Sequence, residues 1–208
     1  MSGPPTRASL GRMDLTDDEL AFHESGHALL SYVEFGSNLT AVDIVGNAER
    51  LGQAVYPRRV WETLAAAETN ANSADRWSRW TGRCALVSHA RVAAAGVVAE
   101  GMRRLDALWW PPGAMAEVAE GGDGATIHQA FCALNRGPGY PYSYELRLRR
   151  EVERWTRERR RVLRDCAVLL LRERAVPGKV FLEVAHAAAT RHGVALSPLR
   201  PWWPPPKR

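Results

Sequence analysis

The sequence predicts a mainly α-helical protein with a small β-hairpin. Apolar residues recur at the three- and four-residue spacing of amphipathic helices over most of the chain. Two short segments, 40–45 and 51–56, are instead typical of strands, and the second ends at Pro57. With 208 residues, 46% of them apolar and 25% charged, the chain has the composition of an ordinary globular domain with a buried core.

The first predicted helix covers residues 17–35. Thr16 and Glu19 have the spacing of a capping box, in which a threonine side chain and a glutamate three residues later satisfy backbone N–H groups at the helix start. Gly36 is a typical helix stop. This helix therefore has a start signal and an end signal in the sequence itself.

The remaining elements follow in chain order. The two strands are expected to pair as a hairpin beside the first helix. After them we expect a loop or weak helix start at 68–75, a helix at 83–104 and an irregular insertion at 105–119 that contains two tryptophans and two prolines. Three further helices are expected, at 125–134, 144–175 and 180–192.

These elements predict one domain between two Pro-rich ends. Residues 1–12 are expected to be disordered, residues 13–195 to form the domain, and residues 196–208 to form a Pro- and Trp-rich tail. The Trp-Pro segments of the insertion and the tail have two interpretations. They anchor a partner protein, or they pack against the protein's own surface.

The stretch H-E-x-x-H at residues 23–27 carries the clearest chemical signal. Residues four apart lie on one face of a helix, so His23 and His27 can direct their imidazoles at one point, as two ligands of a zinc ion do. Glu24 lies beside them and can take a proton from a water molecule that the metal activates. The alternative is a pair of ordinary histidines with a solvated glutamate between them.

Five segments resemble the peptidase domain of the FtsH-type zinc metalloproteases. Residues 21–29, A-F-H-E-S-G-H-A-L, are similar to the family's A-Y-H-E-A-G-H-A-L. Residues 42–45 and 51–57 are similar to its hairpin, residues 95–100 to its G-G-R-A-A-E helix, and residues 122–130 to the segment that bears its third zinc ligand. A sixth segment, the long predicted helix over 145–175 with Pro177 after it, is similar to the family's closing segment, so the likeness extends over about residues 16–190. It implies a helical zincin domain with peptidase activity, without the family's ATPase module and membrane helices.

Two departures from the family pattern concern the site. The second glutamate after A-A-E is Gly101 here. The family's third ligand is an aspartate, which favours Asp123, yet an alignment without a gap places Thr126 at that position. Asp123 also lies at a predicted helix start, where a carboxylate is favoured. His128 is a second candidate, and about 140° of helix separates it from Asp123, so the two should not share one metal. A site without a third protein ligand is the remaining alternative.

Other polar residues allow two interpretations each. Glu100 either orients a ligand imidazole or is a surface glutamate. An arginine-rich run at 157–164 either binds nucleic acid or forms a solvated face neutralised by Glu151, Glu153 and Glu158, and we favour the second. His89, His186 and His192 are expected to have no functional role.

The sequence therefore predicts a zinc metalloendopeptidase with Zn²⁺ bound by His23, His27 and Asp123 and with Glu24 as the general base. We expect a protein or peptide substrate that is unfolded or flexible, and hydrolysis without ATP, because no P-loop sequence is present. A membrane and nucleic acid are not expected as partners, and a homo-oligomer is compatible with the sequence. The sequence shows no apolar run long enough for a secretory signal peptide or a transmembrane helix. Its three cysteines do not have the spacing of a disulfide framework, so we expect a cytoplasmic location. The alternative function is an inactive peptidase-like adaptor that binds a partner through its Trp-Pro segments.

Overall fold

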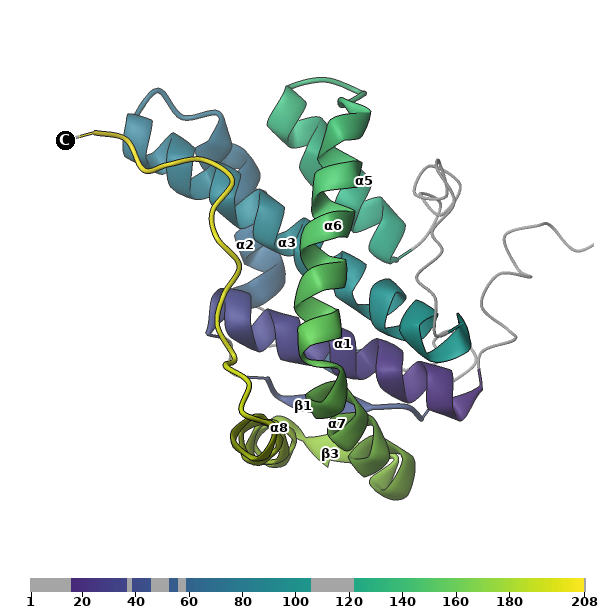
Figure 1. Ribbon diagram of the computed structural model, residues 1–208. Helices are drawn as coiled ribbons and strands as arrows, with labels where there is room; N and C mark the ends of the chain where they lie inside the picture. Colours follow the sequence, from purple (N-terminus) through teal and green to yellow (C-terminus); the bar gives the residue numbers. More distant parts are fainter. Residues whose placement is uncertain (1–15, 37–38, 46–52, 56–58, 106–121, 208) are drawn as a thin grey trace, which may run out of the picture.

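The computed structural model describes residues 16–36, 39–45, 53–55, 59–105 and 122–207. Within these ranges the chain is mainly helical, as the sequence predicts, with one small antiparallel sheet (Figure 1). The helices are α1 (Asp17–Phe35), α2 (Arg59–Ala71), α3 (Arg76–Leu105), α5 (Asp123–Asn135), α6 (Tyr142–Glu158), α7 (Arg160–Glu173) and α8 (Gly178–His192). The strands are β1 (Ala41–Asp43), β2 (Gln53–Val55) and β3 (Ala175–Pro177). The segment 1–12 and nearly all of the insertion 105–119 lie outside the described residues.

Helix α1 has the ends that the sequence predicts. The Glu19 N–H donates to Thr16 Oγ1 over 3.3 Å, and the Thr16 N–H donates to Glu19 Oε2 over 2.8 Å, which completes the capping box. At the other end, Gly36 has a φ of 58°, a left-handed conformation that costs glycine little. Most of α1 between these ends is buried, because α3, α7 and the sheet all contact it.

The core is organised by the close crossing of α1 and α3. A Cβ atom on Gly26 of α1 would lie 2.5 Å from the carbonyl oxygen of Ala95 on α3, so only glycine allows this approach. Ala95 and Ala99, both buried, are the residues of α3 that lie against Gly26. The small side chains that the sequence places in this helix thus bring its backbone close to the H-E-x-x-H turn.

The predicted pairing of the two strands is confirmed, since β1 and β2 are antiparallel neighbours, and β3 adds a third strand in the order β2-β1-β3. Val42 of β1 lies opposite Ala54 of β2 and Val176 of β3, and all pairs are antiparallel. Strand β3 directly follows α7, where the prediction had one helix continuing to residue 175. A Cβ on Gly178 would collide with the backbone of Leu39, so glycine is required where the chain leaves β3.

The predicted helix 144–175 is two helices, with Arg159 between α6 and α7. The Thr156 hydroxyl donates to the Val152 carbonyl over 2.7 Å, a back-bond that bends helices. The Arg159 guanidinium donates to the Trp155 carbonyl and, beyond the helix, to the Ala195 carbonyl. The bond to Trp155 satisfies a carbonyl group in the last turn of α6, next to the break.

The region 68–75, predicted as a loop or a weak helix start, is in part the end of a helix, because α2 extends to Ala71. Helix α2 packs against α3, and its Leu64, Ala67 and Ala71 are buried. Their spacing of three and four residues is helical, and tertiary packing stabilises it. Helix α3 starts seven residues earlier than the predicted residue 83.

The C-terminal tail lies along the domain, running past α6 toward α2 and α3 (Figure 1). Arg91 of α3, only 2% exposed, donates to the Arg200 carbonyl over 2.6 Å and forms ion pairs with Glu34 and Glu151. The Trp202 indole donates to Glu151 Oε2 over 2.8 Å and is 93% buried among aromatic rings that include Phe131. In the tail, the tryptophans therefore pack against the protein's own surface.

Candidate metal centre

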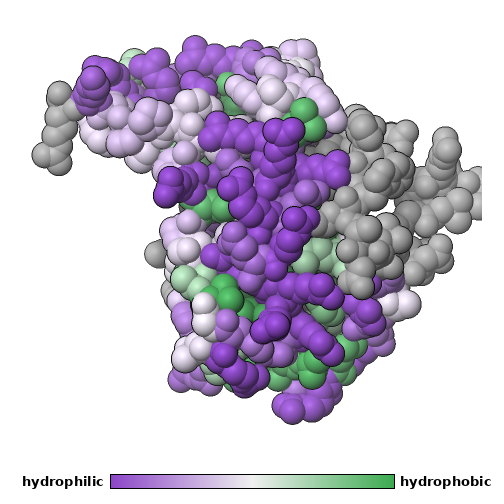
Figure 2. Space-filling model, in the orientation of Figure 1, coloured by the Kyte–Doolittle hydropathy of each residue, from purple (hydrophilic) through white to green (hydrophobic). Residues whose placement is uncertain are grey.

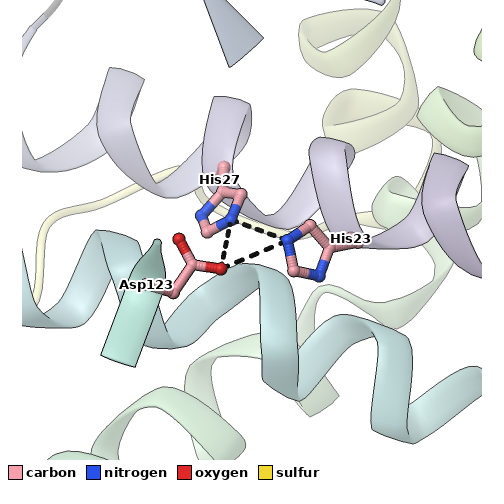
Figure 3. Close-up of side chains that lie close together, drawn as sticks. All are labelled: His23, His27 and Asp123. Atoms are coloured by element: carbon pink, nitrogen blue, oxygen red, sulfur yellow. Dashed lines mark hydrogen bonds and ion pairs between the residues drawn. The ribbon is translucent and has the colours of Figure 1, made fainter. Parts of the chain in front are cut away.

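Three side chains from two distant segments meet beside the crossing of α1 and α3. His23 and His27 come from the middle of α1, and Asp123 is the first residue of α5 (Figure 3). The two Nε2 atoms are 3.0 Å apart, and Asp123 Oδ2 lies 3.3 Å from that of His23 and 3.2 Å from that of His27. Within the described ranges this is the group of ligating side chains that could hold a metal ion.

The other nitrogen of each ring faces an acceptor. His23 Nδ1 lies 3.2 Å from Glu100 Oε2, and His27 Nδ1 lies 2.8 Å from the Val92 carbonyl oxygen. An Nδ1–H that donates to such an acceptor leaves Nε2 with a free lone pair. When both imidazoles are neutral, two nitrogen lone pairs and a carboxylate oxygen are thus directed at one point, an arrangement that a cation stabilises.

The dimensions of this triangle fit zinc. Ligand distances of about 2.0–2.2 Å in a tetrahedral site require ligand atoms about 3.3–3.5 Å apart. The three observed separations, 3.0, 3.2 and 3.3 Å, are close to these values. Two imidazoles and one carboxylate are also a usual ligand set for a zinc ion that keeps a position open for water. His23, His27 and Asp123 are therefore suited to hold Zn²⁺.

Gly96 on α3 makes room for His27. A Cβ at this position would lie 2.3 Å from His27 Nε2 and 2.6 Å from Cε1. The imidazole therefore lies directly against the backbone of α3, four residues from the Val92 carbonyl that orients it. Helix α3 contributes the Val92 carbonyl, the Gly96 backbone and the Glu100 carboxylate, one helical turn apart, to the surroundings of the two histidines.

The electrostatics of the site favour positive charge at the two histidines. Burial by itself would lower the pKa of His23, but the carboxylates of Asp123 and Glu100 raise it to about 10. Burial also opposes the shift at His27, whose pKa is raised by Asp123. Burial raises the pKa of the Asp123 carboxyl. The two imidazoles outweigh this effect and hold the pKa well below its usual range. A divalent cation would interact favourably with the same acceptors.

Glu24 is buried beside His23 and His27, with 5% of its surface exposed. Burial raises the pKa of its carboxyl, and the His27 and His23 imidazoles oppose the rise. Asp43, at the end of β1, adds a like charge that acts in the same direction as burial. A carboxylate with a raised pKa accepts protons more readily at neutral pH, as a general base must.

The structure separates the two candidates for the third ligand. His128 lies one to two turns further along α5, exposed, where its Nε2 contacts Cys132 Sγ and its ring packs against Tyr140. Asp123 instead faces the two histidines of α1. Glu100 contacts the His23 imidazole, and its role in orienting a metal ligand stays a prediction.

The contact of the Val92 carbonyl with His27 is the feature of this candidate site that the sequence did not indicate. Every residue carries a carbonyl, so only the packing of α3 on α1 identifies this one. The remaining histidines lie away from the metal centre. His186 contacts the Tyr32 hydroxyl, His192 contacts Asp165, and His89 packs against the ring of Phe35.

A scan against protein-family models found no match to the chain, and a search of curated proteins by sequence found none. No helix in the part of the chain that the structure describes is long and apolar enough to cross a membrane. The arguments below therefore rest on the residues and the geometry of this chain.

Proposed function

We propose that the protein is a zinc-dependent endopeptidase that cleaves unfolded or flexible polypeptide segments without ATP. His23, His27 and Asp123 hold the metal in this proposal, and Glu24 is the general base. The observation that carries it is the convergence of two Nε2 atoms and one carboxylate oxygen within 3.0–3.3 Å, with both imidazoles oriented by acceptors at Nδ1.

The chemistry divides between the metal and the chain. Zinc, when bound, supplies a Lewis acid that polarises the scissile carbonyl and acidifies water. Glu24 takes the proton of the attacking water and passes it to the leaving amine, and its raised pKa suits both transfers. Glu100 and the Val92 carbonyl hold the two imidazoles in the tautomer with a free Nε2.

The sheet offers a place for the substrate backbone. Among the described strands, β2 lies at the edge of the order β2-β1-β3, and Asp43 of the neighbouring β1 influences the pKa of Glu24. An extended peptide that pairs with β2 would be aligned beside the catalytic helix. Such pairing requires an unpaired substrate backbone, so we expect cleavage of unfolded chains and flexible loops rather than compact domains.

Fold family and location belong to the same proposal. The capping of α1, the glycines at the α1–α3 crossing and the small sheet support a fold like that of the FtsH-type peptidase domain. A cytoplasmic location accords with the three free cysteines.

Hydrolysis of casein by the zinc-loaded protein is the first test, with Glu24→Gln as the matched variant. The variant should keep the fold and the zinc and lose hydrolysis, because only the base is removed.

Each outcome of that test has a consequence. Equal activity of the Glu24→Gln variant and the natural protein would contradict the assigned mechanism. Absence of hydrolysis of any unstructured substrate with zinc bound would favour the adaptor function. Rapid digestion of a stably folded domain without ATP would contradict the proposed substrate class.

A further inference from the structure

A stripe of exposed arginines runs along α6 and α7. It consists of Arg150, Arg154, Arg157, Arg161 and Arg164, and all five side chains are exposed. Arg150, Arg154 and Arg157 have the spacing of one face of α6, and Arg161 and Arg164 have that of one face of α7. Only Arg159 separates the two helices, so the stripe is at most about 21 Å long at 1.5 Å per residue.

The carboxylates that the sequence interleaves with these arginines are bound to other groups. Glu151 accepts from Arg91, Arg147 and the Trp202 indole. Glu153 pairs with Arg149, over 2.6 Å, on its own helix.

The next two carboxylates along the helices are also used elsewhere. Glu158 pairs with the buried Arg159 over 3.0 Å. Asp165 binds His192 and Arg191 of α8. Glu153 and Glu158 pair with arginines of these helices, as in the neutralised face that we favoured from the sequence, but their partners Arg149 and Arg159 lie outside the stripe. These four carboxylates bind a tryptophan of the tail, residues of α8 or arginines that are not part of the stripe. The stripe therefore keeps its positive charge.

The surface over α6 and α7 is strongly hydrophilic and lacks exposed aromatic rings between Arg150 and Arg164. Figure 2 shows strongly hydrophilic side chains gathered along α6 and α7 down the face of the molecule. Between Arg150 and Arg164 there is no exposed large apolar or aromatic side chain, and Trp155 is only 3% exposed. Proteins that hold single strands stack bases on exposed aromatic rings, so this surface is suited to a backbone and not to unpaired bases.

We propose that the α6–α7 stripe binds the phosphate backbone of double-stranded DNA without reading its sequence. Guanidinium groups match phosphate oxygens in geometry and stay charged at every physiological pH. Consecutive arginines of the stripe are about 4.5–6 Å apart along the helix axis, and duplex DNA carries a phosphate charge about every 1.7 Å of its axis, so each guanidinium has phosphates within reach. The chain has a net charge of +5 and a pI of about 9.5, so it is positively charged at neutral pH, as a protein that binds DNA must be.

The test is the salt dependence of binding to a fluorescent 25-base-pair duplex of arbitrary sequence, measured by anisotropy with the full chain. Five phosphate contacts predict a slope of log K against log salt of about −4.5, which is roughly a 500-fold loss of affinity between 50 and 200 mM salt. Replacing Arg157, Arg161 and Arg164 by glutamine should reduce the slope to about −1.8 and weaken binding at 50 mM salt at least about tenfold.

A matched control removes three charges elsewhere. Arg172, Arg174 and Lys179 are exposed cations off the stripe, each paired with a carboxylate. Their triple glutamine variant has the same net charge as the stripe variant and should keep the slope near −4.5. Far-ultraviolet circular dichroism and thermal unfolding verify that both variants fold.

Four results would overturn the proposal. They are no binding of the duplex by the natural chain at 50 mM salt, equal slopes for the two triple variants, tighter binding of a single strand than of the duplex, and equally effective displacement of the duplex by polyglutamate or by vesicles that contain an anionic lipid. The last result would assign the stripe to a different polyanion.

Discussion

Replacing Gly96 by alanine adds one methyl group against a proposed zinc ligand. The new Cβ would lie 2.3 Å from His27 Nε2, whereas ordinary contacts begin at 3.4 Å, so the imidazole must move by about 1 Å or more. Such a shift takes Nε2 out of reach of a metal held by His23 and Asp123, since functional sites tolerate ligand distances within about 0.2 Å. It also strains the 2.8 Å contact of Nδ1 with the Val92 carbonyl.

We expect the zinc affinity of the Gly96→Ala variant to fall by at least about 100-fold, because disturbing an orienting group alone already costs 10–100-fold. The assay is a competition titration against a chromogenic chelator at fixed pH. The control is Gly101→Ala on the same helix, where an added Cβ meets nothing within 4 Å. This control should bind zinc normally and gain up to about 1 kcal/mol of stability from helix propensity. Normal zinc binding by a folded Gly96→Ala variant would refute the reasoning.

Three further substitutions test separate parts of the account. Asp123→Ala should lower zinc affinity far more than His128→Ala, measured by the same competition titration, and equal effects would reject Asp123 as a ligand. Glu100→Gln should lower zinc affinity by about 10–100-fold with the fold intact, because the His23 imidazole loses its charged acceptor; an unchanged affinity would reduce Glu100 to a structural role. Trp202→Ala should cost about 3 kcal/mol in urea unfolding, since the indole is 93% buried against Phe131 and Tyr144, and a cost below about 1 kcal/mol would mean that the tail is not anchored in solution.

The elements that the sequence predicts well are those with local signals. Helix α1 begins and ends as expected because Thr16, Glu19 and Gly36 act within one turn of its ends. The break between α6 and α7 was not predicted, because it depends on the buried Arg159, whose guanidinium reaches the Ala195 carbonyl 36 residues away. Strand β3 was missed because three residues carry no periodicity and its partner β1 is more than 130 residues earlier.

The same distinction applies to the candidate site. The histidine pair is visible in the sequence because a helix fixes the relation of residues four apart. The approach of Asp123 depends on how α5 packs against α3, and the resemblance to FtsH-type peptidases, not the spacing, favoured it. The arginine stripe could be seen in the sequence, but its charge could not, because Glu151 and Glu153 bind arginines outside it.

The most direct test of the metal centre is a crystal structure of the zinc-loaded Glu24→Gln variant, with anomalous diffraction recorded on both sides of the zinc edge. The account predicts one anomalous peak within about 2.0–2.2 Å of the Nε2 atoms of His23 and His27 and of a carboxylate oxygen of Asp123. A peak held by the two histidines with the Asp123 oxygens well beyond 2.2 Å, or a zinc ion bound elsewhere, would contradict it.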